Sequence, residues 1–265
     1  MHNGHKIAQL VRREAELVIS DGDKTLWKGN AAERGIALGY LRETLRGREL
    51  ARHPIRPLRF MGDGLAIKRA VRKNERDGVS LGLKRLYDSM VRNGMGDDED
   101  MFYFARRYIQ ANAVKQTLGL MLELQPMPVF ISSMNGSMVC EAAVSYLDHL
   151  GLKTAGFASN TDRFGKIRQG ISRELEGIDV CMVDGTTKLD ATERKLHELG
   201  LPPVRRSAVI GDSEGDVALM EEASVSIASP YATEEVRRIA KVHMDGVKRE
   251  TSMFVLCPIP KPLFK

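Results

Sequence analysis

Short apolar runs alternate with amphipathic segments near the start of the chain and throughout its second half. The apolar runs predict buried strands, and the segments with apolar residues three or four positions apart predict helices. This alternation predicts an α/β fold, a Rossmann-like parallel sheet with helices on both faces. The predicted strands are residues 17–19, 129–131, 153–158, 178–183, 208–210, 225–228 and 253–256, and the predicted helices are residues 5–15, 137–150, 190–199, 217–223 and 233–241.

The segment between the first two strands has a different pattern. From residue 30 to residue 125 apolar positions recur at helical spacing without strand-like alternation, which predicts about four to six helices. Pro126 ends this segment because proline cannot continue a helix. We therefore predict a core formed by residues 1–28 and 127–265, with a mainly α-helical cap, residues 29–126, inserted after the first strand.

Polar side chains follow three of the predicted strands. Asp21 and Asp23 come directly after the first strand, Ser132 and Ser133 follow the strand at 129–131, and Asp212 and Asp216 follow the strand at 208–210. Burying a carboxylate without a partner costs several kcal/mol, so acids at these positions are poorly explained by packing. Because ligands bind beyond the carboxyl ends of parallel strands, we expect these groups to meet at one edge of the sheet.

The chemistry of these side chains indicates a phosphate and a metal ion. Several carboxylates with no His or Cys nearby are typical ligands of Mg²⁺, which also binds substrate phosphate. Serine hydroxyls and the N–H groups that follow them suit phosphate oxygens. Lys188, in the turn before a predicted helix, is placed to neutralise the negative charge. The sequence therefore predicts a site for phosphoryl transfer.

Two of these stretches resemble motifs of the haloacid dehalogenase superfamily. The run DGDKTL at residues 21–26 is similar to its first motif, DxDx[TV][LV], and GDSEGD at residues 211–216 is similar to its fourth, GDxxxD. Ser132 is similar to its second motif. The third motif is a single lysine, for which Lys188 is better placed than Lys195 or Lys166. The helical insert resembles the cap of phosphoserine phosphatase-like members, although Ser132-Ser133-Met134 stands where that group has Ser-Gly-Gly.

The resemblance implies a role for each matched residue. Asp21 is the nucleophile that forms an aspartyl-phosphate, Asp23 is the general acid and base, and Lys188 stabilises the developing charge. Ser132 and the N–H of Ser133 hold the phosphoryl group, with Lys188 beside them. The Mg²⁺ site is formed by Asp21, Asp23 through its backbone carbonyl, Asp212 and, through the metal's water shell, Asp216.

The function predicted on these grounds is Mg²⁺-dependent hydrolysis of a small phosphomonoester, such as a phosphorylated metabolite. A phosphotransferase or phosphomutase shares the same motifs and stays open as an alternative. A third alternative, a non-catalytic module that binds nucleic acid or protein, is suggested by the basic insert, where 18 Lys or Arg face 12 Asp or Glu. These basic residues are dispersed among acids, which favours a solvated surface and disfavours nucleic-acid binding.

Composition adds few constraints. The chain of 265 residues carries a formal charge of +5, and no apolar run approaches the roughly 18 residues of a membrane helix. The first residues do not resemble a signal peptide, so a cytoplasmic protein is expected. Cys140, Cys181 and Cys257 lack metal-site spacing and are expected to be free thiols. The acidic run at residues 97–100 predicts the start of a helix, because acids are favoured at helix N-termini. Trp27 is expected to be a packing residue. A homo-oligomer is compatible with the sequence.

Overall fold

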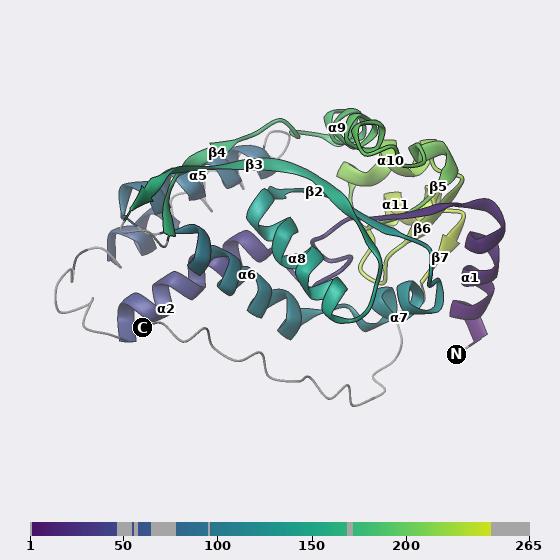
Figure 1. Cartoon of the computed structure of the whole chain (residues 1–265), viewed down its shortest axis with the longest axis horizontal. Coiled ribbons are helices and arrows are strands. Elements are labelled where there is room, and N and C mark those ends of the chain that lie inside the picture. Colours follow the sequence, from purple (N-terminus) through teal and green to yellow (C-terminus); the bar gives the residue numbers. More distant parts are fainter. Residues whose placement is uncertain are drawn as a thin grey trace.

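A seven-stranded sheet forms the centre of the protein in the computed structural model, which describes residues 2–46, 55, 58–64, 78–94, 96–168 and 172–244 (Figure 1). The strand order is β4-β3-β2-β1-β5-β6-β7, and all neighbours are parallel except β3 and β4. The predicted α/β fold with a largely parallel sheet is therefore confirmed. The strands are β1 (Leu17–Ser20), β2 (Val129–Gly136), β3 (Thr154–Arg168), β4 (Ser172–Asp179), β5 (Ser207–Gly211), β6 (Val225–Ala228) and β7 (Val242–His243).

The first strand lies in the middle of the sheet and is buried on both faces. Successive side chains of a strand point to opposite faces, so Val18 packs into one hydrophobic cluster while Leu17 and Ile19 pack into another. Helices cover both faces, as predicted. The Val18 cluster includes α1 (His2–Glu14), α7 (Lys115–Glu123) and α8 (Ser137–His149), and the other cluster includes α9 (Gly185–Glu198), α10 (Val217–Glu222) and α11 (Glu234–Ile239).

The predicted boundaries of the elements between residues 178 and 199 were wrong, for identifiable reasons. The strand predicted at 178–183 begins earlier and ends at Asp179, because the N–H groups of Cys181 and Met182 both donate to the Asn160 side chain, at 2.8 Å each. The helix predicted from residue 190 begins at Gly185, because Asp184 caps it by accepting from the Thr187 N–H. The strand predicted at 253–256 lies outside the described residues.

The described residues between β1 and β2 contain no strand, in agreement with the predicted helical insert. The insert elements are the π-helix η1 (Ala31–Ala37) and the helices α2 (Leu38–Arg46), α5 (Gly78–Arg92), α6 (Asp98–Asn112) and α7. The predicted helix start at the acidic run is confirmed, because Asp97 accepts from the Asp100 N–H at 2.8 Å. Among the helices that the structure describes, none combines the length and apolar character needed to cross a membrane.

The antiparallel hairpin of β3 and β4 connects the sheet to the insert. It extends past the edge of the parallel strands toward α5 and α6 (Figure 1). Arg173 of β4 donates to Asp98 of α6 at 2.8 Å, and the Leu175 N–H donates to the Gly96 carbonyl at 2.8 Å. The insert is thus held by the sheet through two separate stretches of chain, the connections around β1 and β2 and this hairpin.

Candidate active site

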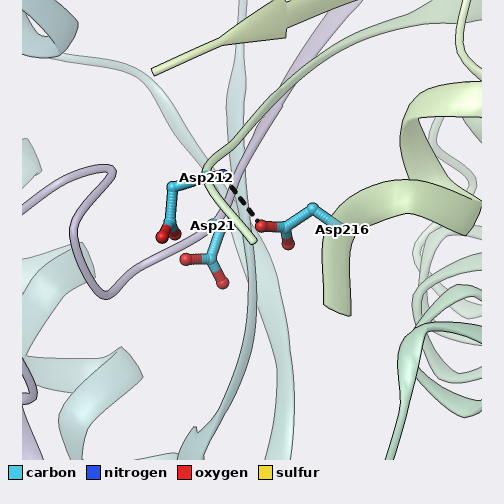
Figure 2. A group of neighbouring side chains, drawn as sticks. All are labelled: Asp21, Asp212 and Asp216. Carbon is cyan, nitrogen blue, oxygen red and sulfur yellow. Dashed lines mark hydrogen bonds between the residues drawn. The ribbon is translucent and has the colours of Figure 1, made fainter. Parts of the chain in front are cut away.

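Three carboxylates from two strand ends meet at the carboxyl edge of the sheet. Asp21 follows β1, Asp212 follows β5, and Asp216 ends the short 3-10 helix η3 (Glu214–Asp216). One oxygen from each lies within 4.8 Å of the others, the only such group of three possible metal ligands among the residues that the structure describes. Figure 2 shows Asp21 and Asp212 side by side, with Asp216 directed toward them. The predicted convergence of the first and fourth motifs is present in the structure.

The backbone around β5 explains how Asp216 reaches this position. Its Oδ2 accepts hydrogen bonds from the N–H groups of Asp212 at 3.0 Å and Ser213 at 3.1 Å. A Cβ on Gly211 would lie 2.5 Å from the Asp216 Cβ, so only glycine leaves room for this tight turn. Asp216 therefore fixes the loop that carries Asp212.

Lys188 lies between two of the carboxylates. Its ammonium group donates to Asp21 Oδ1 and to Asp216 Oδ1, both at 2.6 Å, and only 1% of the residue is exposed. The capped first turn of α9 carries this lysine into the site. Lys195, further along the same helix, instead pairs with Glu198 at 3.0 Å in an exposed position, and Lys166 lies in the β3–β4 hairpin.

The electrostatics of the cluster favour an additional cation. Burial raises the pKa of the Asp21 carboxyl well above its usual range, Asp216 raises it further, and Lys188 only partly opposes the rise. Burial and Asp216 also raise the pKa of Asp212 to about 7. Burial alone would lower the pKa of Lys188, but Asp21 and Asp216 hold it above its ordinary value. Only Lys188, which is buried, and the exposed Lys24, 3.8 Å from Asp212, face these three acids, which leaves negative charge uncompensated.

The donor set fits a hard divalent cation such as Mg²⁺. Both Asp216 oxygens are engaged, one by Lys188 and the other by backbone N–H groups, so Asp216 acts as a support. Asp21 and Asp212 are the carboxylates that would hold the ion. Asp212 now receives only a long hydrogen bond from Thr25, at 3.3 Å, and an ion pair with the exposed Lys24 at 3.8 Å. Carboxylate oxygens without nitrogen or sulfur ligands are the set that Mg²⁺ prefers.

Asp23 has an environment separate from the three-acid cluster. Its Oδ1 accepts from the indole N–H of Trp27 at 2.6 Å and from the Ala31 N–H at 3.2 Å. Burial raises the pKa of Asp23, and these hydrogen bonds oppose the rise. The side chain of Asp23 therefore has different hydrogen-bond partners from that of Asp21.

The two serines after the strand core point in different directions. Ser132 Oγ lies 2.7 Å from Thr192 Oγ1 of α9, and Thr192 donates in turn to the Lys188 carbonyl at 2.7 Å. Ser133 Oγ instead lies beside the first motif, 3.1 Å from where a Cβ on Gly22 would be, and accepts from Asn135. The structure thus brings the Ser133 hydroxyl to the carboxylate loop and the Ser132 hydroxyl to the helix that carries the lysine.

Two residues of this environment were not predicted from the sequence. Thr192 is one helical turn after Lys188, so its position on the same face of α9 was available from the spacing. Trp27 was expected only to pack. The direction of its indole N–H depends on tertiary structure, and no sequence pattern specifies it.

Comparison with known proteins agrees with this geometry. Residues 157–250, which include Lys188, Asp212 and Asp216, match the profile of the haloacid dehalogenase-like hydrolases. A substrate-bound phosphoserine phosphatase has a similar structure, with a TM-score of 0.53, 15% identity, and coverage of 87% of this chain and 93% of that chain. The fold is similar to that of haloacid dehalogenase-like hydrolases. The resemblance drawn from the motifs is thus confirmed for the fold.

Two further solved structures are similar to this protein over most of the chain. A protein of unknown function from Bordetella pertussis has a TM-score of 0.61 at 15% identity, and 88% of this chain and 99% of that chain are covered. A haloacid dehalogenase family hydrolase from Salmonella enterica serovar Typhi has a TM-score of 0.58 at 14% identity, with coverage of 91% and 76%. No curated protein sequence matched this chain. At these identities the similarity describes the fold.

Proposed function

We propose that the protein is a Mg²⁺-dependent phosphatase that hydrolyses a small phosphomonoester through a phosphoaspartate at Asp21. The observation that carries the proposal is the buried Lys188 ammonium group held at 2.6 Å from both Asp21 and Asp216, next to Asp212. A buried carboxylate paired with a cation at the carboxyl edge of a parallel sheet is a competent nucleophile toward phosphorus.

The reaction proceeds in two displacements. A carboxylate oxygen of Asp21 attacks phosphorus, the bond from phosphorus to the ester oxygen breaks, and the departing oxygen takes a proton from Asp23. Water then attacks the phosphoaspartate and gives a proton to Asp23, and the bond from phosphorus to Asp21 breaks. Alcohol and inorganic phosphate are the products, and both aspartates return to their starting states.

The surrounding residues stabilise the charge that develops on phosphorus. Lys188 neutralises the nucleophile and the phosphoryl oxygens, while the Ser133 hydroxyl and neighbouring N–H groups receive the remaining oxygens. Mg²⁺, held by Asp21, Asp212 and the Asp23 carbonyl, would supply Lewis-acid stabilisation of the phosphoryl group. The Ser132 hydroxyl contacts Thr192 of α9, and Thr192 donates to the Lys188 carbonyl, so Ser132 helps to hold Lys188 in position.

The predicted cap follows directly after the loop that carries Asp21 and Asp23. This position of the cap supports a small substrate. An inserted cap restricts the size of the molecule that reaches the strand ends and excludes water. A structural neighbour is a phosphoserine phosphatase, but Ser132-Ser133-Met134 here departs from the Ser-Gly-Gly of that group. We therefore propose a small phosphorylated metabolite as the substrate class and do not assign phosphoserine.

Phosphate release from a panel of phosphomonoesters tests the proposal. We expect turnover that requires Mg²⁺, is abolished by chelation, and falls at least about a thousandfold in Asp21→Asn, as expected for loss of a nucleophile. Asp190→Asn makes the same chemical change at an exposed position of α9 and should retain activity. Equal turnover by wild type and Asp21→Asn would contradict the assignment, and transfer of phosphate to an added alcohol in preference to water would favour a phosphotransferase.

A further inference from the structure

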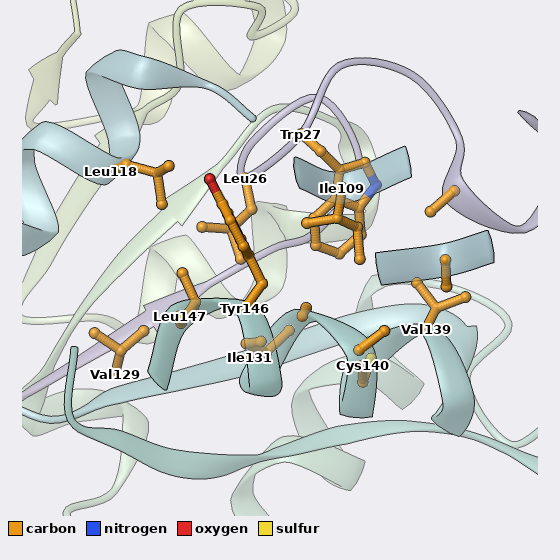
Figure 3. Packing of buried hydrophobic residues seen from close by; sticks show 14 of the residues in the cluster. Leu26, Trp27, Ile109, Leu118, Val129, Ile131, Val139, Cys140, Tyr146 and Leu147 are labelled. Carbon is orange, nitrogen blue, oxygen red and sulfur yellow. The ribbon is translucent and has the colours of Figure 1, made fainter. Parts of the chain in front are cut away.

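The indole of Trp27 is built into the catalytic loop. The ring is completely buried, and Figure 3 draws it in one hydrophobic cluster with Ile109 of α6 and Tyr146 of α8. It also passes across the glycine between the two aspartates, because a Cβ on Gly22 would lie 2.6 Å from the ring. A side chain at position 22, between the two aspartates, would therefore clash with the Trp27 ring.

The backbone on either side of Trp27 is also held by a segment outside the catalytic loop. The Val114 N–H donates to the Leu26 carbonyl at 2.8 Å, and the Lys28 N–H donates to the Asn112 carbonyl at 2.8 Å. These bonds attach the loop to the segment between α6 and α7. Packing and these backbone contacts therefore hold the indole in place, in addition to the hydrogen bond that its N–H donates.

The partner of this N–H is the same oxygen of Asp23 that receives the Ala31 N–H. Two N–H donors converge on Oδ1, at 2.6 Å and 3.2 Å. The Asn135 side chain adds a smaller interaction with the same carboxyl. Because the two N–H donors occupy Oδ1, Oδ2 is the oxygen available for proton exchange. The indole thereby contributes to holding the Asp23 side chain in this orientation.

We propose that Trp27 is a positioning residue for general acid–base catalysis, its indole N–H holding Asp23 so that Oδ2 delivers the proton to the departing oxygen. This inference rests on the proposed phosphatase function. The simpler explanation is that a buried indole N–H needs some acceptor and that Asp23 happens to satisfy it. The two explanations differ in what removal of the N–H does to esters with different leaving groups.

Trp27 is the only tryptophan in the sequence, which permits a clean test. Biosynthetic replacement of tryptophan by β-(benzothienyl)alanine puts sulfur in place of the N–H at this one position and preserves the ring shape. Trp27→Phe provides a second variant that removes the N–H at the expense of some packing volume. Tyr146→Phe, which removes a hydroxyl from another buried ring of the same cluster, is the matched control.

The measurement is kcat/KM for a series of phosphomonoesters, from p-nitrophenyl phosphate to alkyl phosphates. This quantity reports steps up to cleavage of the ester bond, where a poor leaving group depends on proton donation and an acidic phenol does not. We expect the benzothienyl protein to lose about tenfold on alkyl phosphates and less than about twofold on p-nitrophenyl phosphate. In an Asp23→Asn background the same replacement should cause no further leaving-group-dependent loss.

The outcomes separate this inference from the function on which it rests. A loss that is equal for all esters, or no loss in either Trp27 variant, would overturn the positioning role while leaving the phosphatase assignment intact. A leaving-group-dependent loss in Tyr146→Phe would also overturn it, because the effect would then reflect general loosening of the cluster. If the wild-type protein hydrolyses none of the esters, the proposed function fails and the positioning role fails with it.

Discussion

At the residue scale, two candidate catalytic side chains, Lys188 and Asp23, are oriented by neighbours that do not themselves react. Lys188 is held through Thr192 and Ser132, and Asp23 through Trp27. The sequence indicated the acids and the lysine because charged groups at strand ends are costly unless they are used. It did not indicate their supports, because hydroxyls and indoles are ordinary core residues whose direction is set only by packing.

Lys188 offers the sharpest substitution at this scale. Lys188→Met keeps most of the length of the unbranched side chain but removes the charge that Asp21 and Asp216 share. We expect kcat to fall by about a hundredfold or more, because the charge on the transferring group loses a preorganised cation. Steady-state kinetics measure this, with Lys195→Met on the exposed side of α9 as the control. Comparable losses in the two variants would show that the charge on Lys188 has no special role.

The adjacent serines provide a second test. Ser133→Ala should weaken competitive inhibition by inorganic phosphate by about three- to tenfold, the range expected for one lost hydrogen bond. Ser132→Ala should leave phosphate affinity nearly unchanged and lower kcat instead, because its hydroxyl lies against Thr192. Inhibition constants for phosphate and kcat values, measured on both variants, show which of the two serine hydroxyls contacts phosphate. The reverse pattern would mean that Ser132, as the motif resemblance implied, contacts phosphate directly.

At the element scale, sequence periodicity located the core strands but not how far β2 and β3 continue past their apolar cores. The strand cores at β1, β5 and β6 were predicted because each is a short apolar run buried on both faces. β2 continues five residues beyond the predicted end, through the polar residues of the second motif, and β3 continues to Arg168. Polar residues in these extensions carry no strand signal, because their pairing partners come from distant parts of the chain.

The caps of two helices make a matched pair of predictions. Asp97 caps α6 and Asp184 caps α9, and each accepts from the N–H three residues later. Asp97→Ala should destabilise the protein by about 1 kcal/mol without changing kcat. Asp184→Ala should be less stable and also several-fold less active. Asp184 caps α9, and Lys188 lies in the first turn of that helix. Thermal unfolding and kcat, measured on both variants, test the pair, and unchanged activity in Asp184→Ala would contradict the link between cap and lysine.

At the scale of the whole molecule, the sheet, the insert and the β3–β4 hairpin meet around Asp162. This buried residue of β3 accepts from the Met138 N–H at the start of α8, at 2.7 Å. Burial raises the pKa of its carboxyl to about 6, while hydrogen bonds from the Met138 N–H and the Ser137 hydroxyl partly oppose the rise. The Asp162 carboxyl in turn raises the pKa of the buried Tyr87 hydroxyl. Tyr87 belongs to α5 of the insert, so the protonation state of Asp162 affects a junction of all three parts.

The raised pKa predicts a specific pH dependence of stability. An acid with a raised pKa binds more protons in the folded state, so its contribution is favourable at low pH and is lost as pH rises from about 4 to about 6. The free energy of unfolding of the wild type relative to Asp162→Asn should therefore fall by up to about 3 kcal/mol over this interval and then level off. Denaturant titrations at several pH values measure the difference, with Asp190→Asn as a control. A difference that does not depend on pH would contradict the account of this junction.

The phosphoaspartate at Asp21 is the central claim, and trapping it is the most direct test. The protein is mixed with a phosphomonoester and Mg²⁺, quenched, and reduced with borohydride, which converts an aspartyl phosphate to homoserine. Trypsin then releases the peptide of residues 14–24, which contains both Asp21 and Asp23 and allows fragment masses to distinguish them. We predict homoserine at Asp21 alone, and only when substrate is present. Conversion at Asp23, or at neither residue during turnover, would contradict the proposed mechanism.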